Sequence, residues 1–456
     1  MTVGMRTDPL SQSVPQPYRS AGAAALQGTV AVPGDKSISH RCLMLAALAA
    51  GRSEFTGLLE GEDVLATAAA LQACGVAIKR LGDGHWQVDG MGEAGLQEPA
   101  QVLDLGNSGT AVRLLMGLLA AYPITVTFGG DESLSKRPMG RVLTPLKQMG
   151  IQFLGRSGDR LPLTMRSDGA LQAIRYKLPV ASAQVKSAIL LAALGANGTT
   201  VVIEPEPTRD HTERMLHAMG VDLHQEHTHE GVSWSIQRPM GALSPLNLAV
   251  PGDPSSAAFL LGAAAIVPGS ALTLTGVSTN PLRIGFITML QEMGADITLT
   301  NPRLQGGEPV ADIVVRHAPL RAVDIAASRA PSMIDEYLIA AVVAAFATGT
   351  SVFRGLAELR VKESDRLAAA AEGLRLCGVT TVIEGDDLHV VGCGAAGVPG
   401  GATILAQLDH RVAMSFLVMG MASQQPVQVD DVRPILTSFP NFVPLFQQLG
   451  AKLQLV

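Results

Sequence analysis

The residues best suited to chemistry in this chain are cations at the expected starts of helices. They are Lys36 and Arg41 in the first half of the chain and Lys362, Arg366 and Arg411 in the second. The start of a helix carries free N–H groups and the positive end of the helix dipole, so it attracts an anion and disfavours a cation. Lys362 and Arg366 would also share one face of a helix. Cations that gather there in a chain of net charge −6 indicate a site for one or more molecules with several negative charges.

Two carboxylates accompany the second group of cations. Asp335 precedes the apolar run 339–346, where partial desolvation would tune it as a general base, and Glu363 lies within the charged segment 360–366. The structural alternatives are a capping box over 332–336 and a surface run of ion pairs. A protein that only binds an anion gains nothing from acids beside it. The two carboxylates therefore favour a site that moves protons over a non-catalytic anion-binding protein.

Further candidates lie in short polar segments between apolar ones. The turn 105–113 contains Gly109, which would let backbone N–H groups approach a ligand as in phosphate-binding loops. The alternative is that Asn107 or Ser108 in this turn only caps a helix. The remaining candidates are Arg137 in a loop before a proline, Ser182 and Gln184 at the start of a small-residue helix, and Arg209 beside a capping pair of Asp210 and Glu213.

The elements that must position these residues are repeated along the chain. Six segments read as an amphipathic helix that ends at a glycine and is followed by an aliphatic strand. The glycines are Gly75, Gly150, Gly220, Gly294, Gly378 and Gly450. This near-even spacing predicts an α/β protein built from six units of roughly 75 residues.

The sequence AVPGD occurs twice, at 31–35 and at 249–253, about half the chain apart. We expect these two copies to mark the places where the chain passes between two halves, with a ligand in the cleft between them. Two independent domains on a linker are the alternative. The expected boundaries are 33–250 for the first lobe, 23–32 plus 253–456 for the second lobe, 32–35 and 250–253 for a hinge, and 1–22 for a flexible N-terminal tail.

Composition limits the class of protein. A chain of 456 residues with 47% apolar and 16% charged residues predicts a large, well-buried protein of two domains. The net charge of −6 argues against binding to nucleic acid or to a membrane surface. The cysteines form no CxxC pair and no metal-ligand spacing, which favours a reduced cytoplasmic setting without a metal. They are Cys42, Cys74, Cys377 and Cys393.

Along nearly the whole chain, the motifs and their order resemble the 5-enolpyruvylshikimate-3-phosphate synthase family. Their sequences are most similar to the bacterial class II branch of that family. The matching segments are 33–41 (PGDKSISHR), 106–110 (GNSGT), 136–139 (KRPM), 182–184 (SAQ), 209–212 (RDHT), 360–366 (RVKESDR) and 409–411 (DHR). The resemblance implies a two-lobed inside-out α/β barrel of six βαβαββ units, three per lobe. It also implies transfer of the enolpyruvyl group of phosphoenolpyruvate to the 5-hydroxyl of shikimate 3-phosphate, through a tetrahedral ketal and with release of phosphate, without metal or cofactor.

The resemblance further implies roles for individual residues. Asp335 is the expected base on the attacking hydroxyl, and Glu363 or Lys36 is the expected proton donor. The residues implied to bind shikimate 3-phosphate are Lys36, Ser37, Arg41, Ser182, Ala183, Gln184, Arg209, Asp335 and Lys362. The residues implied to bind phosphoenolpyruvate are Lys36, Asn107, Gly109, Arg137, Gln184, Arg366 and Arg411.

Three positions bear on departures from the family and on its relatives. Thr437 stands where many members have a lysine, so one phosphoenolpyruvate contact is missing or supplied elsewhere. Gly109 stands where some class II forms have an alanine that crowds the inhibitor glyphosate, so we expect glyphosate to compete with phosphoenolpyruvate. The sister transferase that acts on UDP-N-acetylglucosamine usually has a cysteine where this chain has Glu132, which counts against that rival. A monomer is expected, because a closing hinge needs no partner.

Overall fold

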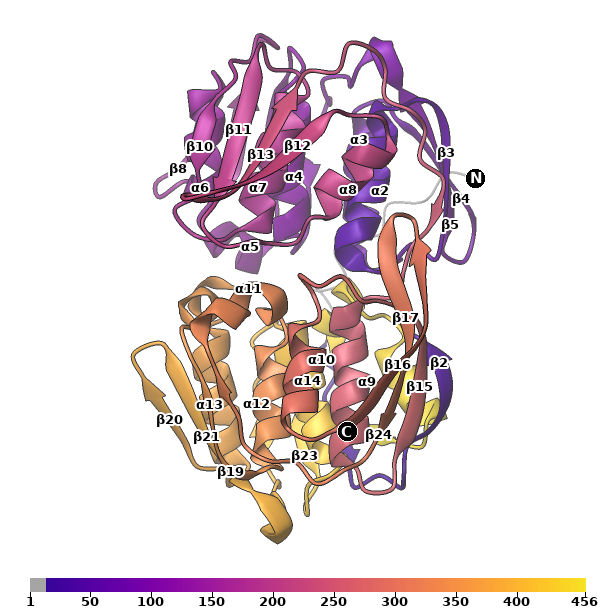
Figure 1. The fold of residues 1–456 in the computed structure, drawn as a ribbon, viewed down its shortest axis with the longest axis vertical. Coiled ribbons are helices and arrows are strands. Elements are labelled where there is room, and N and C mark those ends of the chain that lie inside the picture. The colour runs from indigo at the N-terminus through magenta and orange to yellow at the C-terminus, as the bar shows by residue number, and fades with distance from the viewer. Residues whose placement is uncertain (1–13) are drawn as a thin grey trace.

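A computed structural model describes residues 14–456, which form two lobes stacked one above the other (Figure 1). The predicted tail falls mostly on residues 1–13, outside the described residues. Within the described part of the chain there are six four-stranded sheets, and each has a parallel pair at one end and antiparallel pairs elsewhere. The fold therefore repeats one unit six times, as the spacing of the glycines predicts.

The first lobe holds three of these sheets. Their strand orders are β14(Leu248–Ala249)-β3(Ala50–Thr56)-β5(His85–Met91)-β4(Ala77–Gly82), β6(Leu103–Asp104)-β7(Thr125–Gly129)-β9(Arg160–Arg166)-β8(Gln152–Arg156) and β10(Arg175–Lys177)-β11(Thr199–Glu204)-β13(Gly231–Gln237)-β12(Leu223–Thr228). The helices are α2(Lys36–Leu48), α3(Glu62–Ala73), α4(Gly109–Leu119), α5(Glu132–Lys136), α6(Gly140–Gln148), α7(Ala183–Ala193) and α8(His211–Ala218), with the 3-10 turn η1(Gly92–Ala94).

The second lobe holds the other three. Their strand orders are β16(Asp296–Gln305)-β17(Glu308–Arg316)-β15(Ala271–Ser278)-β2(Gln27–Ala31), β18(Asp324–Ile325)-β19(Thr348–Phe353)-β21(Asp387–Cys393)-β20(Thr381–Glu384) and β22(Thr403–Ile404)-β23(Val427–Val429)-β1(Tyr18–Ala21)-β24(Lys452–Leu455). The helices are α9(Pro254–Ile266), α10(Gly285–Glu292), α11(Ala330–Met333), α12(Tyr337–Ala345), α13(Arg366–Leu376), α14(His410–Gly420) and α15(Phe442–Gln448). The 3-10 turns are η2(Ala327–Arg329), η3(Ala357–Val361), η4(Gly394–Ala396) and η5(Arg433–Thr437).

Each lobe places its most apolar helices inside and its sheets outside. In the second lobe α9, α12 and α14 are buried along their whole lengths, and α2, α4 and α7 fill the first lobe with only a few half-buried positions. Small residues allow these helices to approach closely: a methyl group at Gly117 in α4 would overlap the carbonyl oxygen of Ala188 in α7. A helix that is apolar on all sides is stable only when surrounded by protein. The six-fold repeat therefore yields two separate hydrophobic cores.

The repeated glycines end their helices as predicted. All six have a positive φ, between 81° and 107°, which is the left-handed conformation that glycine adopts without strain. Each is followed by the aliphatic residue that enters the next strand or its lead-in. The local rule for a helix end thus holds in every unit.

The expected N-terminal tail, residues 1–22, includes a strand, so its boundary at residue 22 is wrong. Residues Tyr18–Ala21 form β1, which pairs antiparallel with both β23 and β24 in the second lobe. In this last unit β1 fills the place that a unit's own fourth strand fills elsewhere. Without it β23 and β24 would each leave an unpaired edge.

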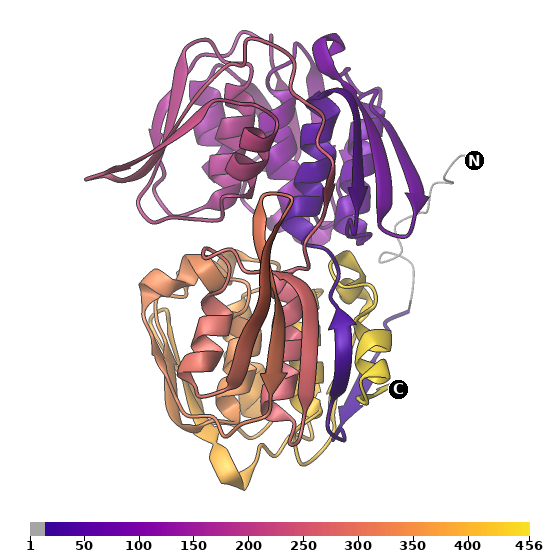
Figure 2. The same ribbon diagram turned by 45° about the vertical axis from the view of Figure 1, so that its right-hand side comes forward.

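Two strands pair in one lobe, although the chain that follows each of them belongs to the other lobe. β2 leads into the first lobe but pairs with β15 in the second, and β14 leads into the second lobe but pairs with β3 in the first. The β16–β17 hairpin runs beside these crossings and reaches up to the first lobe (Figure 2). At its tip the carbonyl of Gly307 accepts a hydrogen bond from Arg214 of the first lobe, at 3.2 Å. In the part of the chain described here, no helix combines the length and the apolar character needed to cross a membrane.

Candidate active site

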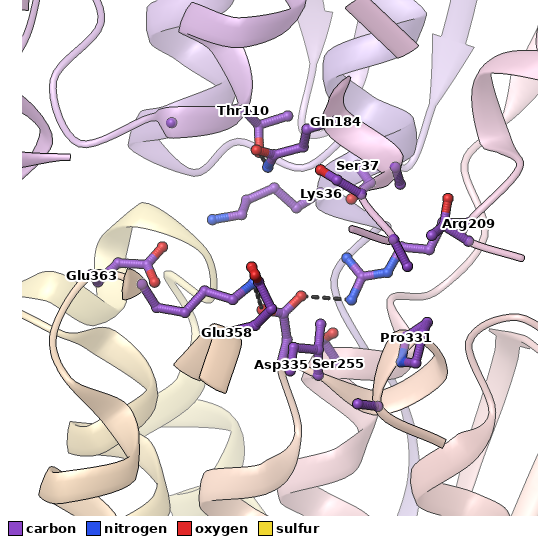
Figure 3. A pocket seen from close by; sticks show the side chains of 18 of the residues that line it. Lys36, Ser37, Thr110, Gln184, Arg209, Ser255, Pro331, Asp335, Glu358 and Glu363 are labelled. Atoms are coloured by element: carbon purple, nitrogen blue, oxygen red, sulfur yellow. Dashed lines mark hydrogen bonds and ion pairs between the residues drawn. The ribbon is translucent and has the colours of Figure 1, made fainter. Parts of the chain in front are cut away.

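A cavity of about 460 Å³ lies between the lobes and is lined by both. Figure 3 shows side chains of the two lobes directed into it from opposite sides. The residues predicted from sequence converge there, with two exceptions. Those that line the cavity are Lys36, Ser37, Arg41, Gly109, Arg137, Ser182, Ala183, Gln184, Arg209, Asp335, Lys362, Glu363 and Arg411. Asn107 and Arg366 lie behind the wall.

The first turn of α2 supplies one wall of the cavity. Asp35 caps the helix by accepting a hydrogen bond from the N–H of Ile38, at 2.9 Å. Lys36 follows, and its Nζ lies 2.8 Å from Oδ2 of Asp63. The cap fixes the direction of the helix start, so the cation is held at the dipole end that an anion would otherwise occupy.

Arg41 lies one turn further along α2 and is almost fully buried. Its guanidinium donates to the carbonyl of Ser37 at 2.9 Å, to Oγ of Ser187 at 2.8 Å and to Oγ1 of Thr212 at 2.7 Å. All three acceptors are neutral. Burial lowers the pKa of Arg41 to about 10. The group remains a cation at neutral pH and has no direct carboxylate partner among the described residues, so it is ready to receive an anion.

The starts of α4 and α7 form the adjoining wall. Ser108 and Ser182 cap these helices. The side-chain amide of Gln184 has a fixed orientation, because its Oε1 accepts from Arg113 at 2.8 Å and its Nε2 donates to Oγ1 of Thr110 at 2.9 Å. Burial, with repulsion from Arg137, lowers the pKa of Arg113 to about 10. Sequence analysis did not select Arg113, although its place four residues after Gly109 puts it on the same helix face.

The segment that leads to Arg137, expected to be a loop, is instead helix α5, capped by Asp131. Arg137 ends it, and its guanidinium is buried against Asn107 and donates to Oγ of Ser133 at 3.1 Å. Asn107 therefore holds Arg137 rather than facing the cavity. Arg137 is brought within 3.6 Å of Oε1 of Glu363 in the other lobe.

Asp335 is the centre of the second-lobe wall and does not cap a helix, contrary to the capping alternative. Its Oδ2 lies 2.6 Å from Nη2 of Arg209 across the cleft (Figure 3). Its Oδ1 accepts from Lys362 at 3.3 Å. Burial raises the pKa of this carboxyl, but the surrounding cations outweigh burial and hold the pKa well below its usual range. Asp335 is thus an anion in the free site.

The predicted helix face shared by Lys362 and Arg366 does not exist. Helix α13 begins at Arg366, and Lys362 lies before it in extended backbone, yet both side chains approach Oδ1 of Asp335. Arg366 is fully buried and donates to both oxygens of Asp409, at 2.8 and 3.1 Å. Its Nη2 also lies 2.6 Å from Oε2 of Glu363. Arg366 therefore supports the cavity wall and reaches a ligand only through a displacement of these partners.

Glu363 and Arg411 complete this wall. Burial raises the pKa of Glu363, but Arg366 and Arg137 outweigh it and hold the pKa well below the usual range. Arg411, in the first turn of α14, donates to the backbone carbonyl of Asp335 at 2.9 Å. Neighbouring His410 is neutral, because burial and nearby cations hold its pKa well below its usual value. In the free site Glu363 is therefore an acceptor rather than a proton donor.

The two AVPGD copies meet at a buried arginine that sequence analysis missed. Arg283 donates to Asp35 at 3.0 Å and to Asp253 at 3.2 Å, and the two copies pair through Gly34 and Gly252. A methyl group at Gly34 would overlap the backbone of the first lobe. Arg283 lies far from both copies in sequence, so no local signal marks it.

The residues described contain one group with metal-ligand character, formed by Asp210, His211 and Glu308. Nδ1 of His211 lies 2.7 Å from Glu308, and its Nε2 faces Arg283 at 3.2 Å. Asp210 accepts from Arg214 at 2.8 Å, instead of forming the capping pair predicted with Glu213. These donors are engaged with one another across the lobes, and the arrangement does not require an ion.

The positions singled out as departures lie as follows. Thr437 is buried and donates to the carbonyl of Pro434 at 2.8 Å, so it does not replace the family lysine in the cavity, although its neighbour Ser438 lines it. Glu132 is exposed on α5 and pairs with Lys136 at 2.6 Å. Gly109 lines the cavity, and a methyl group on it would lie 2.8 Å from Nη1 of Arg113.

Comparisons with known proteins agree over nearly the full chain. A family model described as EPSP synthase (3-phosphoshikimate 1-carboxyvinyltransferase) matches residues 21–446. The 3-phosphoshikimate 1-carboxyvinyltransferases of Paracoccus denitrificans and Paramagnetospirillum magneticum are each 56% identical over 439 residues, covering 96% of this chain and 98% of theirs. The structure of EPSP synthase from Acinetobacter baumannii is 42% identical, with a TM-score of 0.84 over 96% of this chain and 100% of that one. The enolpyruvyl transferase NikO from Streptomyces tendae shares the fold at 18% identity, with a TM-score of 0.75 over 97% of this chain and 99% of its own.

Proposed function

Because the chain belongs to the EPSP synthase family, we propose that the cavity between its lobes binds both substrates of that family's reaction. The chain transfers the enolpyruvyl group of phosphoenolpyruvate to shikimate 3-phosphate, in the shikimate pathway. The resemblance drawn from the motifs, the two-lobed α/β fold and the reaction are therefore confirmed. What remains a proposal is where each substrate lies and which residue does what.

The observation that carries the proposal is the convergence of residues from both lobes on one cavity. Both substrates are polyanions, and the cavity gathers cations whose charges are only partly balanced. Ser37, Arg41, Gln184, Arg209 and Lys362 hold shikimate 3-phosphate, joined by Lys36, Ser182, Ala183 and Asp335. Lys36, Gly109, Arg137, Gln184 and Arg411 hold phosphoenolpyruvate, with Asn107 and Arg366 as partners of these groups. Cations fixed in place before the reaction stabilise the charge that develops on the leaving phosphate.

We assign Asp335 as the base. In the free site Arg209 and Lys362 lower its pKa, which makes it a weak base. When these cations turn to the anionic groups of substrate, the pKa of Asp335 rises toward the range useful for catalysis. Asp335 then accepts the proton of the 5-hydroxyl as that oxygen bonds to the central carbon of phosphoenolpyruvate.

The methylene carbon must gain a proton in the same step, giving a tetrahedral ketal. Lys36 can donate as it stands in the structure, whereas Glu363 must first take up a proton. A ligand that draws Arg366 and Arg137 from Glu363 raises the pKa of that carboxyl and supplies this condition. Loss of one proton from the new methyl group then accompanies cleavage of the carbon–oxygen bond and release of phosphate.

The assignment is tested by phosphate release from phosphoenolpyruvate, with shikimate 3-phosphate and, separately, UDP-N-acetylglucosamine as acceptor. We expect release only with shikimate 3-phosphate and a loss of about 10²- to 10⁴-fold in kcat for Asp335→Asn. The control is Asp296→Asn, the same change at an exposed strand residue. Full activity in Asp335→Asn overturns the role of Asp335, and release with the nucleotide sugar overturns the acceptor assignment.

We also propose that substrate closes the lobes about the chain crossings at 32–35 and 250–253. Two cross-lobe ion pairs support this closure: Arg209 with Asp335 at 2.6 Å, and Arg141 with Glu358 at 2.8 Å. Small-angle scattering with and without shikimate 3-phosphate is the test, and identical dimensions overturn the proposal.

The hinge, a monomeric state and a cytoplasmic location remain proposals. One chain supplies every residue of the cavity, which supports the monomer, and the four free cysteines support a reducing compartment.

A further inference from the structure

A buried group of charges lies directly behind Arg41 and has no part in the reaction as derived above. Lys186 of α7 is fully buried, and its Nζ lies 2.8 Å from Oε2 of Glu204 and 2.7 Å from Oε1 of Glu213. Ser187 and Thr212, the neighbours of Lys186 and Glu213 in the chain, are the two hydroxyls that receive hydrogen bonds from Arg41. The charges and the cavity wall are thus joined by adjacent residues.

The two carboxylates of this group are not equivalent. Glu204 accepts hydrogen bonds from the backbone N–H and hydroxyl of Thr208, from Nε1 of Trp234 at 3.1 Å, and from Lys186. These donors satisfy both oxygens of the Glu204 carboxylate. Glu213 is equally buried, but in the described chain neither of its oxygens accepts a well-aligned hydrogen bond, which leaves the ion pair with Lys186. Glu213 is the member of the group that is poorly stabilised as an anion.

The charges balance only if Arg41 is counted with them. Lys186 and Arg41 supply two positive charges, and ionised Glu204 and Glu213 supply two negative ones. Burial lowers the pKa of Arg41, and Glu213 is the carboxylate that raises it most. Burial, together with Glu204, raises the pKa of Glu213 despite the attraction of Lys186. Glu213 therefore depends on Arg41 to compensate its charge.

We propose that Glu213 takes up a proton when an anionic group of shikimate 3-phosphate reaches Arg41. The anion cancels the charge of Arg41 and leaves the buried group with one negative charge in excess, which protonation of Glu213 removes. The charged groups that face Glu213 are Lys186 on α7, Glu204 on β11 and Arg41 on α2, with Arg214 beside it on α8. This inference rests on the proposed binding of shikimate 3-phosphate at Arg41.

The linkage has a definite sign. Binding raises the pKa of Glu213 above its value in the free protein, so affinity is highest below the free pKa and falls as pH rises through it. The fall ends above the pKa of the complex. A structural role for Glu213 alone predicts no such slope.

Calorimetric titration with shikimate 3-phosphate tests this, in two buffers of different ionisation enthalpy. We choose about pH 8, because a phosphate monoester with a second pKa of about 6 is already a dianion there and adds no proton of its own. The wild-type protein is expected to take up a fraction of one proton for each molecule bound. Shikimate, which has the carboxylate but no phosphate, shows the same uptake if Arg41 holds the carboxylate and none if Arg41 holds the phosphate.

Glu213→Gln removes the titrating group and keeps its shape. We expect proton uptake to vanish and shikimate 3-phosphate to bind about threefold to tenfold more tightly at about pH 8, since one pKa unit corresponds to a tenfold change. Glu226→Gln, the same change on the exposed strand β12, is the matched control and leaves both quantities unchanged. If Glu213→Gln does not fold, the slope of wild-type affinity against pH takes its place.

The outcomes separate this inference from the proposed function. No binding of shikimate 3-phosphate to the wild-type protein overturns the proposed function. Binding without proton uptake and without a pH slope overturns the role of Glu213. Uptake that persists in Glu213→Gln, or weaker binding by that variant, does the same.

Discussion

The two AVPGD copies begin helices of the same kind in the two lobes, side by side at one cavity, but the residues that follow the shared turn differ. Asp35 caps α2, and Asp253 caps α9, each through a hydrogen bond to a backbone N–H in the first turn. Both turns line the cavity. After the cap, α2 carries Lys36 and Ser37 where α9 carries Pro254 and Ser255, and Arg41 of α2 corresponds to Phe259 of α9. The backbone arrangement is therefore independent of the chemistry placed on it.

The difference follows from where each side chain finds its partners. Arg41 donates to neutral groups and keeps its charge for a ligand, whereas Phe259 packs edge-on against Phe442 with ring centroids 6.1 Å apart. α9 is buried at every position from Pro254 to Ile266, although the apolar ring of Phe259 also borders the cavity. We conclude that the first copy serves binding and the second serves the core of its lobe. Paired substitutions in the two helices can break this comparison.

The largest expected effect on function comes from Arg41→Met, which keeps most of the side-chain volume and removes the charge. Loss of one partner from a buried, hydrogen-bonded charge pair costs about 2–5 kcal/mol, so kcat/KM for shikimate 3-phosphate should fall by about 30- to 3,000-fold. Steady-state kinetics with each substrate varied in turn provide the measurement. An unchanged KM for shikimate 3-phosphate would contradict the assignment of Arg41 to that substrate.

The matching change in the other copy is Phe259→Ala. Phe259 is 2% exposed, and removal of a buried phenyl ring costs about 3–5 kcal/mol of unfolding free energy. We expect a lower midpoint of denaturation by urea with a KM for shikimate 3-phosphate close to that of the wild type. Arg41→Met, by contrast, should raise the KM for shikimate 3-phosphate, whatever its effect on stability. If both variants lose stability and keep their kinetics, the two copies do not differ as argued.

A glycine in each lobe, Gly109 and Gly262, allows the same comparison between cavity and core with a smaller expected effect. A methyl group at Gly109 would lie 2.8 Å from Arg113 and 3.2 Å from Arg137, both beside the part of the cavity proposed to bind phosphoenolpyruvate. Overpacking costs about 1–3 kcal/mol, so Gly109→Ala should raise the KM for phosphoenolpyruvate about tenfold and weaken glyphosate inhibition at least as much. Inhibition assays at fixed shikimate 3-phosphate measure both.

The control for this change is Gly262→Ala in α9. A methyl group there would lie 3.0 Å from the side chain of Ile339, inside the second core and away from the cavity. This variant should change stability and leave glyphosate inhibition unaltered. A wild-type enzyme that is active at glyphosate concentrations far above the KM for phosphoenolpyruvate would refute the expectation of competition.

Sequence analysis predicted what depends on neighbours in the chain. The six glycine helix ends and the helix starts that carry Lys36, Arg366 and Arg411 follow from local rules and are present in the structure, whereas Lys362 lies outside a helix. The capping interpretations of Asp335 and Glu213 were wrong, because each carboxylate meets a partner from another element: Arg209 across the cleft and Lys186 on α7. A capping pattern in the sequence predicts only contacts between residues that are close in the chain, and it takes no account of partners from other elements.

The missed features depend on contacts between distant segments. β1 looked like part of a tail because its partners, β23 and β24, lie at the opposite end of the chain. Arg283 joins both AVPGD copies but follows neither of them closely. Arg113 fixes Gln184 from a different helix. Contacts between segments far apart in the chain produce no periodic pattern and no fixed residue spacing, so a single sequence does not reveal them.

The smallest expected effect concerns the pair at the mouth of the cavity, where Arg141 of α6 meets Glu358 of η3 with both carboxylate oxygens at 2.8 Å. The side chains are 47% and 36% exposed, so the pair should contribute about 0.2–1 kcal/mol to the proposed closure. Arg141→Glu and Glu358→Arg should each raise the KM for shikimate 3-phosphate by about two- to fivefold, and the double swap should restore it. The effect of either single change should shrink at high salt, because exposed charges are screened. If the double swap fails to restore the KM, Arg141 or Glu358 contacts substrate directly, and closure depends on Arg209 and Asp335 instead.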